Sequence, residues 1–121
     1  MIVVSDEQFE ELMEQAFERL PKVHRDAVKN VAIVYADEPS EAQRAKLRPG
    51  EVLLGLYEGV PLARRQGVTS YGPDKITLFK EALCARVTSL AALREEIYHT
   101  LWHEIAHYFG LDHAAINKLD R

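Results

Sequence analysis

The sequence has little cysteine, no long apolar run and no excess of positive charge. Cys84 is the only cysteine among 121 residues, which excludes an internal disulfide and a metal cluster built from several thiolates. No run approaches the roughly 20 apolar residues that span a bilayer, so we expect no membrane role. The formal net charge is -4, which disfavours contact with phosphate backbones, and we expect no nucleic-acid partner.

A secretory leader is also missing from the first residues. They contain no basic segment followed by an apolar stretch and a small-residue cleavage site. Together with the single cysteine, which we expect to be a small buried side chain, this pattern predicts a cytoplasmic protein.

The composition is that of an ordinary globular chain. Apolar residues make up 47% and charged residues 28% of 121 residues, about the size of one domain. We therefore expect a single domain over residues 1–121, with its oligomeric state left open.

The local patterns predict a helix, three strands and further helices. Ser5 and Gln8 form a capping-box pattern ahead of apolar residues at helical spacing, and Pro21 ends this helix. The expected strands are residues 30–37, 51–59 and 74–79, with a short helix from Ser40 to residues 48–50, a long loop over 60–73, and helices over 80–87 and 89–110. This order predicts an α+β fold, in which a small sheet of three to four strands is backed by an N-terminal and a C-terminal helix.

The segment HEIAHYFGLDH, residues 103–113, carries the chemistry. His103 and His107 are four residues apart, so a helix places both imidazoles on one face, where they can converge on one ion. His99 is one turn earlier, but its eight-residue separation from His107 spans roughly 12 Å of helix, too far for both to share an ion. Gly110 favours the left-handed turn that ends a helix, which would bring His113 back as a third ligand.

Three imidazole ligands leave a fourth position of a tetrahedral ion for water, which is the arrangement of a catalytic site. An ion held by neutral ligands lowers the pKa of that water. Glu104 lies beside the pair of histidines and would accept the proton as general base. With this composition, five specified residues at these spacings arise by chance in about 10⁻⁵ to 10⁻⁴ of chains, so coincidence is a poor explanation.

These five residues match HExxHxxGxxH, the extended signature of the zincin metallopeptidases. The whole chain resembles the small bacterial zincin-like metallopeptidase family, which implies a minimal zincin-like domain with zinc held by His103, His107 and His113. Metzincins share the long signature and have a methionine-containing turn after the third histidine, whereas both methionines here precede the signature. The chain is therefore similar to the minimal relatives.

The resemblance also implies that a strand bordering the cleft pairs with an extended peptide substrate. The candidate strand residues are Ile76, Thr77, Leu78 and Phe79. His99 and Asp112 are candidates for orienting the ligand imidazoles by hydrogen bonds.

The leading hypothesis is thus a zinc-dependent metallopeptidase that acts on a peptide or protein substrate, with weak or narrow activity allowed. Imidazole sites also accept other divalent metals, so the native ion stays open. A metal-dependent ribonuclease-like protein of the rRNA-maturation kind also uses three histidines at this spacing, although that family typically has glycine in place of Glu104. A third hypothesis is a catalytically inactive metal-binding module that regulates a partner.

Overall fold

Residues 1–61 and 74–111 of the computed structural model form an α+β fold, as the sequence predicts. Helix α1 (Asp6–Arg19) begins at the predicted cap, where the amide of Gln8 donates to the Ser5 hydroxyl over 3.1 Å and the Ser5 amide donates to the Gln8 side chain over 2.9 Å. Pro21 does end this helix, but it also stands before a second one, α2 (Lys22–Ala27), that the sequence analysis missed. Proline fits a helix start because the first amides of a helix have no partner within it.

Three strands form the sheet of the described residues. They are β1 (Val31–Ala36), β2 (Gly55–Glu58) and β3 (Asp74–Phe79). The expected strand over 51–59 is shortened at its start. The amide of Phe79 donates to the carbonyl of Leu54, and β3 ends there, so the preceding residues have no strand beside them to pair with.

The strand order is β1-β3-β2, with β3 in the centre. β1 runs parallel to β3, from the pair Val31 and Asp74 onward, whereas β2 runs antiparallel to it. Because β3 is the central strand, its last four residues are buried. They are Ile76, Thr77, Leu78 and Phe79.

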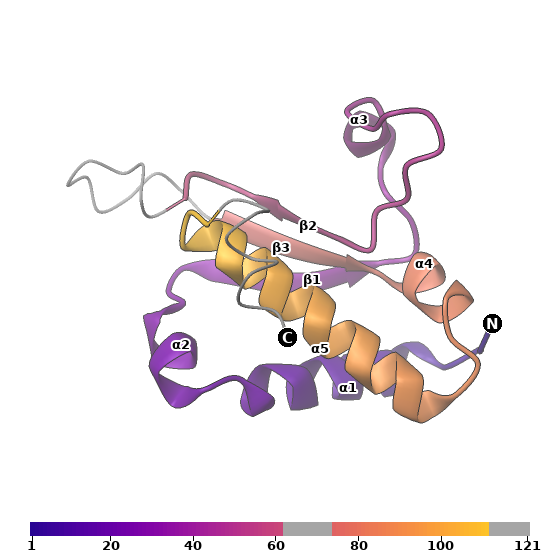
Figure 1. Cartoon of the computed structure of the whole chain (residues 1–121), viewed down its shortest axis with the longest axis horizontal. Helices are drawn as coiled ribbons and strands as arrows, with labels where there is room; N and C mark the ends of the chain where they lie inside the picture. Colours follow the sequence, from indigo (N-terminus) through magenta and orange to yellow (C-terminus); the bar gives the residue numbers. More distant parts are fainter. Residues whose placement is uncertain (62–73, 112–121) are drawn as a thin grey trace.

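The remaining helices are α3 (Glu41–Arg44), α4 (Lys80–Ala85) and α5 (Leu90–Tyr108). The predicted cap at Ser40 is present, with the same reciprocal bonds to Gln43 that begin α1. Helix α5 crosses the sheet, and α1 lies along α5 (Figure 1). No helix in the described ranges is both long and apolar enough to cross a membrane.

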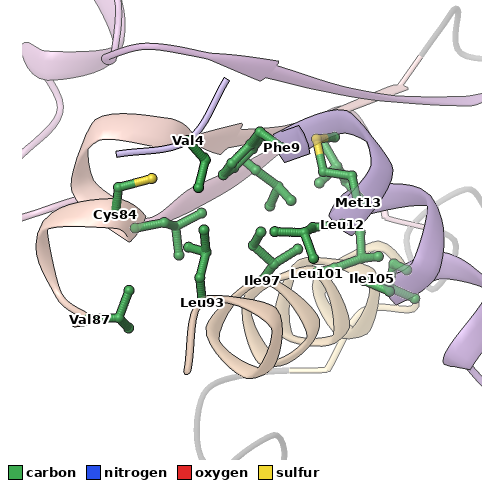
Figure 2. Close-up of a cluster of buried hydrophobic side chains, with 14 of the residues drawn as sticks. Val4, Phe9, Leu12, Met13, Cys84, Val87, Leu93, Ile97, Leu101 and Ile105 are labelled. Atoms are coloured by element: carbon green, nitrogen blue, oxygen red, sulfur yellow. The ribbon is translucent and has the colours of Figure 1, made fainter. Parts of the chain in front are cut away.

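The core lies between α1, α5 and one face of the sheet. Ile97 and Leu101 of α5 are completely buried and point toward Phe9 and Leu12 of α1 (Figure 2). Cys84 closes one end of this cluster as a buried free thiol, and burial raises its pKa. Truncating one of the large core side chains to alanine costs about 2–5 kcal/mol, so this packing fixes the position of α5 against the sheet.

An ion pair also joins α1 to α5 at the surface. Arg19 of α1 donates two hydrogen bonds to the carboxylate of Glu95 on α5, and its guanidinium stacks 4.0 Å from the centre of the Tyr98 ring. This bidentate ion pair links the two helices at the surface and adds to the core packing.

Candidate metal centre

The last two turns of α5 carry the paired imidazoles. The rings of His103 and His107 have their centroids 4.9 Å apart, and both side chains are half-buried. The core contacts of α5 turn its opposite side toward β2, so the two rings face the space between the helix and that strand. The helical spacing that the sequence predicts is therefore present.

Glu104 joins this pair. One ligand atom each from His103, Glu104 and His107 can be chosen so that all lie within 4.8 Å of one another. Imidazole nitrogens suit zinc, copper, iron or nickel, and a carboxylate oxygen suits the same ions or accepts a proton. The donor set fits a divalent metal ion.

The chain reverses after α5 as the sequence predicts. Gly110 has a φ of 92°, and its amide donates to the carbonyl of His107 over 2.9 Å. The amide of Leu111 donates to the carbonyl of Ala106 over 3.1 Å. These two bonds form a Schellman motif, which needs a left-handed residue that glycine supplies without steric cost. His113 and Asp112 lie outside the described residues.

The carboxyl group of Glu104 is shielded from water. Only 8% of the residue is exposed, and its Oε1 accepts a hydrogen bond of 3.1 Å from the backbone amide of Tyr57. Burial raises the pKa of Glu104 to about 7, and the amide of Tyr57 opposes this rise. A carboxyl with a pKa near neutrality can both accept and release a proton at physiological pH, which is the requirement for a general acid–base group.

Close packing of β2 against α5 produces this burial. A Cβ added at Gly55 would lie 2.7 Å from Cγ2 of Thr100 and 3.3 Å from Cγ of Glu104. Only a residue without a side chain lets the strand approach the helix so closely. The sequence analysis passed over Gly55, although a glycine inside a strand pattern is a known signal of close backbone approach.

Tyr57 is held in place by a buried carboxylate. Its hydroxyl donates to Oδ2 of Asp74 over 2.8 Å, and Asp74 is only 2% exposed. The ring of Tyr57 also meets the ring of Tyr108 edge to face, with centroids 6.0 Å apart. Sequence reasoning missed this arrangement, because the group that contacts Glu104 is a backbone amide, and backbone amides carry no residue signature.

A cleft of about 430 Å³ opens above these groups. Residues 51–56 form one wall, and the other wall is the face of α5 that carries His99, Thr100, His103, Glu104 and His107. His99 is exposed and lies one turn before the paired imidazoles, on the rim of the same cleft. The cleft is large enough for a few residues of an extended peptide.

The expectation that Ile76, Thr77, Leu78 and Phe79 pair with a substrate is wrong. All four residues lie in β3, whose two edges are occupied by β1 and β2. A peptide adds to a sheet only at an edge with unpaired backbone groups. The strand that borders the cleft is β2, which comes earlier in the chain.

Comparison with known protein families identifies the family of this chain. The model of the zincin-like metallopeptidase family matches residues 28–121, which include the whole sheet and α5. The chain belongs to the zincin-like metallopeptidase family. This membership implies a metal ion in the protein, and the cluster of two histidines and a glutamate on α5 fits one.

No curated protein matches this zincin-like metallopeptidase chain. Among solved structures, a conserved hypothetical protein from Thermo thermophilus is similar, with a TM-score of 0.54 and 21% sequence identity. The match covers 86% of this chain and 92% of the other. It shows that the two chains share a fold.

Proposed function

We propose that this zincin-like protein is a zinc-dependent peptidase in which Glu104 acts as general base. The observation that carries the proposal is the buried carboxyl of Glu104 beside the imidazoles of His103 and His107, with one ligand atom from each residue within 4.8 Å of the others. A solvated glutamate on a helix surface has neither this burial nor these neighbours, so the geometry suits proton transfer beside a bound ion.

His103 and His107 would hold the ion, and His113 is proposed as the third ligand on the reversal that Gly110 begins. Bound there, a zinc ion supplies a Lewis acid that polarises the scissile carbonyl and makes water acidic. Glu104 would take the proton of the attacking water and pass it to the departing amine. The hydrogen bond from Tyr57 holds the carboxylate at the wall of the cleft, which supports this role.

The substrate backbone is proposed to lie along the wall formed by residues 51–56. Because Leu54 bonds to β3 through its carbonyl, the alternation of an antiparallel ladder turns the amide and carbonyl of Gly55 away from β3. An extended peptide can pair with these groups while its carbonyl carbon faces the paired histidines.

Glu104→Gln tests the assignment against Glu96→Gln as a matched control. Glu96 lines the same cleft on the same helix, where it pairs with Arg86 over 3.5 Å, but it lies outside the group that can hold a metal. Both variants and the unchanged protein would be loaded with zinc, analysed for metal content and incubated with a broad peptide library read by mass spectrometry.

We expect Glu104→Gln to lose cleavage by at least about a hundredfold while it retains zinc, and Glu96→Gln to cleave like the unchanged protein. Loss of zinc in Glu104→Gln would make this residue a ligand and refute its role as base. Cleavage of RNA in a parallel assay would favour the ribonuclease-like alternative. If the unchanged protein cleaved neither peptides nor RNA, the result would favour a catalytically inactive binding module.

A further inference from the structure

A second groove lies at the other edge of the sheet, between α1 and β1. It encloses about 610 Å³, more than the cleft beside α5. Its floor is apolar and consists mainly of Met13 and Phe17 from the helix and Ile33 and Tyr35 from the strand. β3 separates this edge of the sheet from β2, so the groove is distinct from the candidate metal centre.

The helix wall of the groove carries a stripe of negative charge. Glu10, Glu14 and Glu18 are all exposed and line the groove at successive turns of α1, about 6 Å apart along the helix axis. None of them forms an ion pair with a residue in the described ranges, and Glu10 accepts a hydrogen bond from the hydroxyl of Tyr35. Like charges four residues apart destabilise a helix by a few tenths of a kcal/mol per pair, so a cationic partner would relieve a repulsion that the free protein carries.

The opposite wall is the outer edge of β1. The amide of Asp74 donates to the carbonyl of Asn30. In a parallel pair, every second residue of a strand bonds to the same neighbouring strand, so the residues of β1 at even positions bond to β3. The backbone groups of Val31, Ile33 and Tyr35 therefore point away from β3, toward the groove. Within residues 1–61 and 74–111, no strand pairs with this edge. The edge can accept an added strand.

The two walls run side by side, in opposite directions. Phe9, near the start of α1, meets the ring of Tyr35, near the end of β1, with centroids 5.5 Å apart. In Figure 1, β1 runs toward the side of the N-terminus and α1 runs away from it. A strand added to β1 would therefore extend along the glutamate stripe rather than across it.

We propose that this groove binds an extended, basic segment of another protein, which adds to β1 as a strand and has lysine or arginine at every second position. Side chains on one face of a strand repeat about every 6.6–6.8 Å, close to the spacing of about 6 Å between the glutamates. The aliphatic stems of lysine and arginine would cover the half-buried Phe17, while their charged ends reach the rim.

Charge also argues against a second copy of this chain as the occupant. Pairing of two β1 edges would bring two glutamate stripes together, in a protein whose formal net charge is already -4. Repulsion between the two stripes disfavours a second copy of this chain, whereas a cationic partner is attracted to the glutamates.

The test is fluorescence anisotropy of the full-length protein with a labelled peptide of about seven residues in which lysine and threonine alternate. The matched variants are Glu14→Lys and Glu11→Lys. Both residues are exposed on α1, but only Glu14 lines the groove. A lysine at position 14 also gains favourable spacing to Glu10 and Glu18, so loss of binding could not be ascribed to a weakened helix.

We expect Glu14→Lys to weaken binding at least about tenfold and Glu11→Lys to leave it within about twofold. A peptide of the same composition with its lysines consecutive, and one with N-methylated amides, should both bind at least about tenfold more weakly. Equal weakening by the two variants, or equal binding of the N-methylated peptide, would overturn the proposal. The proposal would also be overturned if sedimentation showed that the unchanged protein is a dimer and that Glu14→Lys dissociates it. Glu104→Gln should bind the peptide normally, so this result and that of the peptidase assay are independent.

Discussion

The backbone amide of Tyr57 donates a hydrogen bond of 3.1 Å to the carboxylate of Glu104, across 47 residues of sequence. The contact joins the strand that borders the cleft to the helix that carries the paired imidazoles. It also shows that the environment of Glu104 is made by tertiary packing, because the groups that bury this side chain come from β2 as well as from α5.

Glu104→Gln is expected to stabilise the metal-free protein at pH 8, by about 1–3 kcal/mol. The pKa of Glu104 is raised to about 7, so at pH 8 the folded protein keeps a buried negative charge that a neutral amide avoids. Urea unfolding in the presence of a chelator measures the difference. The control is Glu96→Gln, at a half-buried position on the same helix, and its free energy of unfolding should change by less than about 0.5 kcal/mol. A destabilised Glu104→Gln protein would contradict this account.

Gly55→Ala should destabilise the protein by about 1–3 kcal/mol, because the added Cβ would lie 2.7 Å from Cγ2 of Thr100. Thr100→Ser removes that methyl group, so the double variant should recover a large part of the loss. Thermal unfolding of the two single variants and the double variant gives the coupling between the sites. Simple additivity of the two changes would mean that the strand and the helix do not meet at these atoms.

The pair of Arg19 and Glu95 should couple α1 to α5 in a pH-dependent manner. A hydrogen bond from Arg19 holds the pKa of Glu95 below its usual 4.5. Because the folded-state pKa is lowered, the stabilisation is present above the unfolded value of 4.5 and is lost as pH falls through the lower folded value. A double-mutant cycle of Arg19→Ala and Glu95→Gln at pH 7 and at pH 3 measures it. A coupling that persists unchanged after Glu95 is protonated would contradict an interaction between the two charges.

Zinc should raise the midpoint of thermal unfolding, since an ion that binds only the folded protein stabilises it by mass action. His103→Ala and His107→Ala should abolish this shift, because each removes one imidazole from the cluster. His99→Ala is the matched control, since His99 lies on the same helix at the rim of the cleft but outside the cluster. If His99→Ala also lost the zinc-dependent rise of the midpoint, His99 would contribute to metal binding.

The sequence predicts those parts of the fold that depend on neighbouring residues. The caps at Ser5 and Ser40 lie where their side chains predict, because a capping box involves residues only three apart. The reversal at Gly110 was also predictable, since one left-handed residue completes the motif. The fold class and the family were predictable from the order of elements and from the signature that begins on α5.

Features that depend on distant residues were not predictable in this way. Periodicity identified residues 74–79 as a strand, but it contains no information on the order of strands in the sheet. A pattern of this kind therefore could not show that Ile76–Phe79 lies in a central strand, whereas β2 lies at an edge. The role of Tyr57 is carried by a backbone amide, and any residue except proline supplies one.

The approach of Gly55 to α5 has a consequence for the protein before it is fully folded. An unfolded chain already contains every residue of the signature, yet its glutamate is surrounded by water and has the acidity of any other glutamate. The raised pKa of that side chain is a property of the folded protein, because it arises when a strand from the middle of the chain packs against α5. The signature residues alone do not give Glu104 this property, and the packing of β2 against α5 does.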